Sequence, residues 1–283
     1  MQPTSQRDLL LIAAARLSVG SGRLRLLARG DDEPLREWVL GVSSRPVAHA
    51  RSEAKQILTA LATFGARIVA IGDDDYPAGL RDLADAPAFL CVRGTLPLRG
   101  IAIIGSRTPP PQAESFAHDF ARKAGEPVIS GLALGIDAAA HHGALEAGTP
   151  TLAYVGNGFG ETYPREHASL EQSIIGAGGA IATERFPHEH VTRFALVKRD
   201  RLQAAHARAV VLAASEAEGG AMQTLQQARA LGRPCFVLTP PRSGAQGAPA
   251  WGGNVRALAA GAFAIPGDVD EALRILHAHR NIH

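Results

Sequence analysis

Short apolar segments alternate with helical segments along most of the chain, and this alternation constrains the fold more than any other feature. Seven segments rich in Val, Ile, Leu or Ala are expected to be strands: 66–71, 101–104, 127–129, 151–155, 179–183, 208–214 and 234–238. From residue 101 on, each is followed by Gly, Ser or Pro and then by helical periodicity, which is typical of a parallel sheet with helices on both faces. The predicted fold class is α/β, a doubly wound, extended Rossmann-like sheet. Such sheets bind ligands beyond the carboxyl ends of their strands.

The first part of the chain differs from this pattern and is expected to be all helical. Its apolar residues recur at helical spacing, with a break at Gly20-Ser21-Gly22. Two helices around a Gly-x-Gly turn are typical of a helix-hairpin-helix, whose turn amides can hold a DNA phosphate, but a plain helical hairpin is the favoured interpretation. We predict a small helical domain (SAM- or helix-hairpin-helix-like) over 1–64 and a Rossmann-like domain over 65–283. The second domain is expected to contain a loop at 240–253 and to end with a helix at 269–278.

Composition narrows the class of protein. Of the 283 residues, 46% are hydrophobic and 20% are charged, and no run of about 18 apolar residues suggests a membrane span. The N-terminus lacks the basic region and cleavage site of a signal peptide. Cys91 and Cys235 stand in apolar surroundings, so buried reduced thiols and a cytoplasmic protein are expected. Since the net charge is only +2, nucleic-acid binding would need a local basic patch.

Two turns made of small residues end neighbouring predicted strands. Gly105-Ser106-Arg107 follows the strand at 101–104, and Ser130-Gly131 opens a longer turn that runs through Gly135 to Asp137. The backbone N–H groups of these turns are expected to form a floor suited to phosphate, which Arg107 would reach bidentately. Asp137 is expected to be the N-cap of the next helix.

Common cofactor, metal and hydrolase sites lack their residues here. A dinucleotide site needs three glycines in its first turn and a carboxylate after the second strand, where this chain has Ser130-Gly131. The sequence contains neither a P-loop motif nor a Gly-x-Ser-x-Gly elbow. His141-His142 and His188-Glu189-His190 lack further ligands at familiar spacing. We therefore expect no cofactor, no metal and no catalytic residue.

The two glycine turns begin an ordered series of short motifs. It continues with Gly156-Asn157-Gly158-Phe159, Tyr163-Pro164-Arg165-Glu166-His167, Thr183-Glu184, Arg199-Asp200-Arg201, Gly219-Gly220-Ala221-Met222-Gln223-Thr224 and Gly232-Arg233-Pro234. Over roughly residues 75–265 this series resembles the DprA (Smf) family of DNA-processing proteins. The resemblance implies a homodimer in the cytoplasm that binds single-stranded DNA in a basic pocket. It also implies that the protein protects incoming DNA in natural transformation and recombination, and loads the recombinase RecA onto it without covalent chemistry.

The predicted DNA-binding residues combine the small residues of the turns with basic side chains and one aromatic ring. They are Gly105, Ser106, Arg107, Ser130, Gly131, Gly135, Gly156, Gly158, Phe159, Arg165, His167, Lys198, Arg199, Arg201, Gly219, Gly220 and Thr224. Phe159, Tyr163, Phe186 and Phe194 are expected either to stack on bases or to pack in the core. Glu184, at a strand end, is expected to fix Arg107 or a glycine turn.

The chain departs from the family pattern in three places. The family usually shows Arg-Asn-Arg where Arg199-Asp200-Arg201 stands, and the aspartate offsets part of the arginine charge. It shows Ser-Gly-Ser-Leu-Ile-Thr where this chain has 219–224. Many members continue into a winged-helix domain, whereas this sequence stops where that linker would begin.

An alternative function is binding or hydrolysis of nucleotides, as in the related LOG (lysine-decarboxylase-like) family. The Pro-Gly-Gly-x-Gly-Thr-x-x-Glu segment of that family resembles residues 218–224. However, Gln227 stands where that family has its catalytic glutamate, and an amide cannot stabilise a developing ribosyl cation as a carboxylate does. A fold kept only for protein interaction is a further alternative.

Overall fold

The computed structural model describes residues 6–41, 44–241 and 249–279, which form a nine-stranded sheet with helices on both faces. The strands are β1 (Ala66–Ala70), β2 (Phe89–Gly94), β3 (Gly100–Ile104), β4 (Val128–Ser130), β5 (Thr151–Tyr154), β6 (Ala180–Thr183), β7 (Ala207–Leu212), β8 (Cys235–Leu238) and β9 (Phe263–Ile265). Their order is β1-β2-β6-β5-β4-β3-β7-β8-β9. Strand β2 is antiparallel to both its neighbours, and the other pairs are parallel. The predicted fold class is confirmed.

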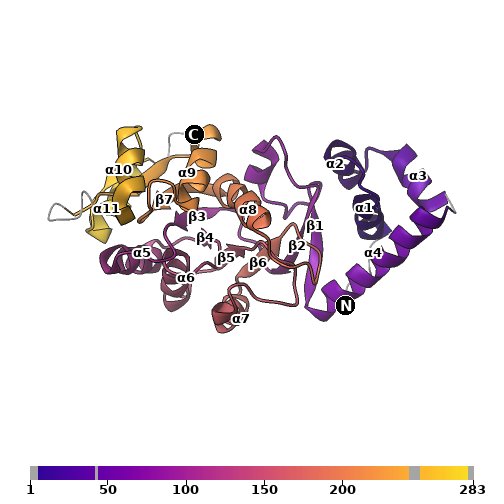
Figure 1. Cartoon of the computed structure of the whole chain (residues 1–283), viewed down its shortest axis with the longest axis horizontal. Coiled ribbons are helices and arrows are strands. Elements are labelled where there is room, and N and C mark those ends of the chain that lie inside the picture. Colours follow the sequence, from indigo (N-terminus) through magenta and orange to yellow (C-terminus); the bar gives the residue numbers. More distant parts are fainter. Residues whose placement is uncertain (1–5, 42–43, 242–248, 280–283) are drawn as a thin grey trace.

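Helices cover the two faces of the sheet with separate apolar layers. They are α5 (Pro111–Lys123), α6 (Ile136–Glu146), α7 (Ala168–Gly176), α8 (Arg193–His206), α9 (Gly220–Ala230), α10 (Gly252–Ala259) and α11 (Val269–Ala278), with short 3-10 turns η1 (Ala78–Asp82), η2 (Arg165–His167) and η3 (Pro249–Trp251). Along β3, Ile101 and Ile103 pack with α5, α6 and α11, whereas Ala102 and Ile104 pack with α8 and α9. Figure 1 shows α5 and α6 on one side of these central strands and α8 and α9 on the other. This division follows from the alternation of side chains along a strand. None of the described helices is long and apolar enough to cross a membrane.

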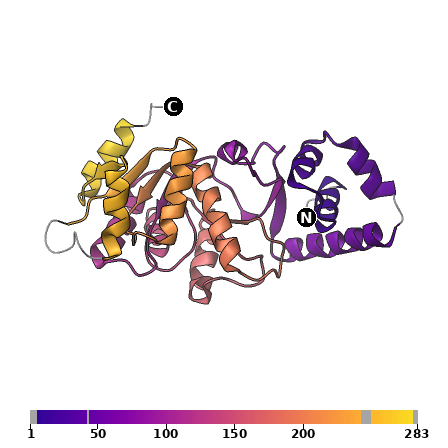
Figure 2. The same ribbon diagram turned by 45° about the horizontal axis from the view of Figure 1, so that its top comes forward.

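Four helices precede the sheet: α1 (Gln6–Arg16), α2 (Ser21–Arg29), α3 (Glu33–Gly41) and α4 (Arg45–Thr63). They lie beside β1 and β2, at the opposite end of the elongated molecule from α10 and α11 (Figure 2). Their buried side chains belong to the same apolar cluster as Ile68 of β1. Arg7 pairs with Asp73, and Arg25 donates to the carbonyl oxygen of Ala86, so polar contacts also join the two parts. The predicted division at residues 64 and 65 falls between α4 and β1, and separate domains stay a prediction.

Several boundaries differ from the sequence expectation. The break expected at Gly20-Ser21-Gly22 is shorter, because Ser21 already begins α2. Strands β2 and β9 were not expected as strands. Of the loop expected at 240–253, residues 242–248 lie outside the described part, and the residues from Pro249 onward form η3 and the start of α10. Cys91 and Cys235 are buried free thiols, as predicted.

Asn254 in α10 fastens the segment that follows β7. Its Oδ1 accepts from the backbone N–H of Ser215 at 3.0 Å, and its Nδ2 donates to the carbonyl oxygens of Ala213 (3.0 Å) and Leu238 (2.9 Å). The side chain is fully buried, so no water is at hand to replace these bonds. Asn254 thereby joins α10 to the ends of β7 and β8.

We expect Asn254→Ala to lower the free energy of unfolding by about 2–4 kcal/mol, because three buried backbone groups lose their partners. Chemical denaturation followed by circular dichroism measures the change. Val255→Ala in the same helix is the control, since Val255 is 44% exposed, and it should cost less than about 0.5 kcal/mol. Equal stability of the Asn254→Ala variant and the wild type would contradict the fastening role.

Candidate functional site

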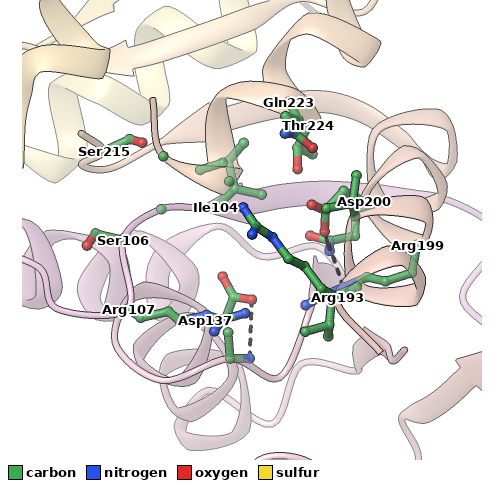
Figure 3. Close-up of a pocket in the computed structure, with 18 of the residues that line it drawn as sticks. Ile104, Ser106, Arg107, Asp137, Arg193, Arg199, Asp200, Ser215, Gln223 and Thr224 are labelled. Carbon is green, nitrogen blue, oxygen red and sulfur yellow. Dashed lines mark hydrogen bonds and ion pairs between the residues drawn. The ribbon is translucent and has the colours of Figure 1, made fainter. Parts of the chain in front are cut away.

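The order in which successive strands are added to the sheet reverses between the parallel neighbours β3 and β7. From β3 the chain builds outward through β4, β5 and β6, and from β7 it builds the other way through β8 and β9. A cavity of about 710 Å³ opens beyond the carboxyl ends of these two strands. Its walls come from the β3–α5 and β7–α9 loops, the starts of α6 and α9, and one side of α8 (Figure 3). This is the position at which doubly wound sheets bind ligands.

The β3–α5 turn contributes Ser106 and Arg107 to the cavity wall. The backbone N–H of Ser106 donates to the carbonyl oxygen of Ala214 at 2.7 Å, so this amide is not available to a ligand. The Ser106 hydroxyl accepts from the N–H of Thr108. Arg107 is exposed, and its guanidinium has no hydrogen bond or ion pair with the described part of the chain. It is therefore free to bind an anion.

The β4–α6 turn does not form the open floor of N–H groups that was expected. The N–H groups of Gly131 and Ala133 both donate to Asp137 Oδ2, at 3.1 and 3.3 Å. The Asp137 side chain thus accepts the hydrogen bonds that these N–H groups were expected to donate to a phosphate. The expectation that Asp137 is an N-cap is wrong as well, because the N-cap position belongs to Gly135 and Asp137 lies inside α6. Burial raises the pKa of Asp137, although Arg199 and these N–H groups oppose the shift.

Arg199 crosses from α8 to the sheet and lies against this turn. It is buried, and its Nη1 donates to the carbonyl oxygen of Tyr154 at 3.1 Å. A Cβ atom on Gly131 would lie 1.4 Å from that Nη1, so the turn needs glycine in order to admit the guanidinium. Nε lies 3.2 Å from Asp200 Oδ1, a charge contact that is not aligned as a hydrogen bond. The guanidinium therefore holds β5, α8 and the β4–α6 turn together.

Asp200 brings a carboxylate into the cavity. Its side chain is 16% exposed, and Oδ1 accepts from Gln203 Nε2 at 3.4 Å in addition to its contact with Arg199. Burial raises the pKa of Asp200 to about 6, and the neighbouring Arg199 only partly offsets this effect. Near neutral pH Asp200 is thus ionised, and its buried charge lowers the stability of the folded state.

The start of α9 faces the cavity with Gly219, Gly220 and Thr224. Gly219 is the N-cap of this 11-residue helix and, as a glycine, has no side chain to cap it. The positive end of the helix dipole is therefore left open toward the cavity. Glu218, beside it, pairs with Arg256 at 2.8 Å. These three predicted residues line the cavity together with Gly105, Ser106, Arg107 and Arg199.

The structure directs Arg201 away from the cavity. It is buried, and it binds Asp85 at 2.8 Å and Glu184 at 2.7 Å. Lys198 also pairs with Glu184, at 3.6 Å. The expectation that Glu184 fixes Arg107 or a glycine turn is therefore wrong. Lys198 and Arg201 do not line the cavity.

The loop after β5 has mainly structural contacts. Phe159 is buried and packs against Phe64, with 6.4 Å between ring centroids, so it offers no exposed face to a base. A Cβ on Gly158 would lie 1.7 Å from the carbonyl oxygen of Phe186, which requires glycine there. Arg165 is exposed but pairs with Glu161 at 3.0 Å.

The remaining predicted residues support the turns. His167 is buried, with Nδ1 2.7 Å from the carbonyl oxygen of Leu132. The Ser130 hydroxyl donates to the carbonyl oxygen of Ile103 inside the sheet. Gly156 lines a small hollow that adjoins the cavity beside Tyr163. Of the other aromatic residues, Phe186 stacks on Phe89, whereas Tyr163 and Phe194 are exposed.

Among the cavity residues that the predicted set did not contain, Arg193 and Asp200 carry charges that bear on ligand binding. Arg193 is the first residue of α8, after Thr192, whose hydroxyl caps the helix by accepting from the N–H of Ala195. Arg193 is exposed and has no hydrogen bond or ion pair among the described residues. In the sequence, Thr192 was the signal that a helix begins at Arg193. In the sequence analysis, Asp200 was considered only because its negative charge offsets part of the positive charge of Arg199 and Arg201.

The raised pKa of Asp200 predicts a pH-dependent stability effect. The unfolded carboxyl ionises near its ordinary value of 3.8, whereas the folded one keeps its proton until about 6. As the pH rises through this window, the unfolded state loses its proton first, and folding stability falls. We expect Asp200→Asn to raise the free energy of unfolding by about 1–3 kcal/mol at about pH 8, and by almost nothing at about pH 4. Urea denaturation at both pH values measures this, and an equal effect at both would contradict the assignment.

Comparison with known proteins agrees with this fold and its motifs. The family model of the DNA recombination-mediator protein A matches residues 67–276. The DNA processing protein DprA of Streptococcus pneumoniae is 36% identical over 171 residues, which are 59% of this chain and 60% of that protein. Protein Smf of Escherichia coli is 31% identical over 173 residues, covering 59% of this chain and 46% of that protein. This chain thus spans about half of the length of such relatives.

Two solved structures share the fold. The X-ray structure of DprA from S. pneumoniae has a TM-score of 0.69 at 22% identity, and covers 93% of this chain and 92% of its own. A structure of DprA from Helicobacter pylori, described for its single-stranded DNA binding mode, has a TM-score of 0.64 at 24% identity and covers 75% of this chain and 96% of its own. On the family match over 67–276, the chain belongs to the family of the DNA recombination-mediator protein A, also called DprA or Smf.

Proposed function

We propose that this protein binds single-stranded DNA at the cavity between β3 and β7. One observation carries the proposal: two exposed arginines, Arg107 and Arg193, line this cavity without any carboxylate partner in the described part of the chain. Most other arginines near the sheet are neutralised, such as Arg201 by Glu184 and Arg208 by Glu126. Unpaired guanidinium groups at a ligand-binding edge suit phosphate oxygens.

The positions of the positive and negative side chains determine how a nucleotide would enter the cavity. Arg107 and Arg193 are exposed and belong to the mouth, whereas Asp137 and Asp200 are largely buried. The N-terminus of α9 adds its partial positive charge beside the mouth. A phosphodiester backbone that runs past the mouth meets the arginines and remains outside the buried carboxylates. A single strand fits this arrangement better than a duplex, because its bases are free to turn inward.

The relatives support the same ligand. The H. pylori protein was described for its binding of single-stranded DNA, and several curated relatives are named DNA processing proteins. The family resemblance extends the proposal to loading of a RecA-type recombinase on incoming DNA, to a homodimer and to the cytoplasm. We include these as parts of the proposed role in natural transformation and recombination.

We expect Arg107→Ala and Arg193→Ala each to weaken binding of a short oligo-dT by about 1.5–3 kcal/mol, because each removes a charge-assisted hydrogen bond. Each should also reduce the dependence of log affinity on log salt by about 0.7. Fluorescence anisotropy at two salt concentrations measures both quantities. Arg36→Ala is the matched control, since it removes the same charge from α3, far from the cavity, where Arg36 pairs with Glu33. If Arg36→Ala weakens binding as much as the cavity variants do, the proposed site is wrong.

We further propose that the protein binds DNA without covalent chemistry. Gln227 is exposed on α9 and does not line the cavity, and Glu184 is held by Arg201 and Lys198. The carboxylates at the cavity are Asp137, Asp200, Glu216 and Glu218. Asp137 is bound by backbone N–H groups, Glu218 is paired with Arg256, and Glu216 is exposed, so Asp200 is the carboxylate to test for a hydrolytic alternative.

The purified protein is expected to release no base from AMP, cytokinin-type nucleotides or NAD, even at high protein concentration. Chromatography of the incubated nucleotides detects any free base. The same preparation should bind single-stranded DNA, which shows that the protein is folded and competent. Base release that disappears in Asp200→Asn would instead establish a nucleotide hydrolase.

A further inference from the structure

We propose that Asp200 reads the edge of a base inserted into the cavity, so that the pocket favours bases with an amino donor over uracil and thymine. The inference rests on the proposed binding of single-stranded DNA and names a determinant of its base preference. It depends on an acceptor atom that the protein itself leaves unused.

The two oxygens of Asp200 have different surroundings. Oδ1 accepts a hydrogen bond from Gln203 Nε2 at 3.4 Å and lies in an ion pair 3.2 Å from Arg199 Nε. Oδ2 makes no hydrogen bond to the described residues, and it is not among their buried unpartnered atoms. Since Asp200 lines the cavity, this oxygen is an acceptor open to whatever enters.

The cavity can hold a base in front of this oxygen. Its volume of about 710 Å³ exceeds that of a nucleotide, and Leu196 and Tyr163 supply apolar wall. The free cations, Arg107 and Arg193, are at the exposed mouth, and Asp200 is mostly buried. With its phosphate at the arginines, a nucleotide points its base inward, toward Asp200.

The charge around Asp200 favours an acceptor role. Facing it are Arg199 on the same helix, Arg107 from the β3–α5 loop, Asp137 from α6, and Glu216 and Glu218 from the β7–α9 loop. Arg199 already holds Oδ1. The pKa of about 6 leaves the carboxylate ionised above neutral pH. An ionised carboxylate can only accept hydrogen bonds. Facing the 4-position of a pyrimidine, it attracts the amino group of cytosine and repels O4 of uracil and thymine, which leaves their N3–H as the one donor on that edge.

The test compares two short oligonucleotides that alternate dT with dC or dT with dU, because cytosine and uracil differ only at N3 and the 4-position. At about pH 8 the wild-type protein is expected to bind the dC strand about tenfold more tightly by anisotropy. Asp200→Asn should bring the ratio within about twofold, since an amide can turn to offer either a donor or an acceptor. Glu33→Gln makes the same charge change on α3, where Glu33 pairs with Arg36 away from the cavity, and should leave the ratio unchanged.

Equal binding of the two strands by the wild type at about pH 8 overturns the base-reading role, as does an unchanged ratio in Asp200→Asn. If that variant fails to fold, wild-type protein at about pH 5 replaces it, because protonation of Asp200 should also reduce the ratio. A ratio that persists at this pH counts against the role. Failure to bind either strand at low salt overturns the proposed function itself.

Discussion

The buried guanidinium of Arg199 is the interaction on which the site depends. It reaches from α8 to the carbonyl oxygen of Tyr154, lies against Gly131 and contacts Asp200. An unpaired buried cation would cost several kcal/mol, so the guanidinium depends on the nearby carboxyl group of Asp137 and on the tight glycine turn that admits it. Three elements are thereby fixed relative to one another before any ligand binds.

The contacts of Asp137 change how the second glycine turn, between β4 and α6, is interpreted. A turn of small residues after a parallel strand suggests a phosphate floor, but the N–H groups of Gly131 and Ala133 are already bound by Asp137. The anion in this nest is part of the protein. In the proposed mode of DNA binding, contacts to phosphate therefore come from the mouth of the cavity, where Arg107 and Arg193 have no ion pair with the described part of the chain. The motif predicted a floor for phosphate, and the structure instead places a carboxyl group of the protein against these N–H groups.

The sequence predicted those features that depend on local periodicity. Apolar runs identified β1 and β3 to β8, and helical spacing identified α11 with its observed bounds. Strand β9 was missed because two of its three residues are exposed, and β2 was missed although four of its six residues are buried. Side-chain partners were beyond reach, since Arg201 meets Asp85 across 116 residues of sequence and Arg199 meets Tyr154 across 45.

Helix α8 explains why a basic motif yielded only part of a basic pocket. Successive residues on a helix point about 100° apart, so Arg199, Asp200 and Arg201 cannot share one direction. Arg201 turns toward Asp85 and Glu184, Arg199 toward the sheet, and Asp200 into the cavity. Arg193 begins the same helix at the mouth. One helix therefore supplies a cation at the entrance, a carboxylate inside and two buried guanidinium groups that hold it in place.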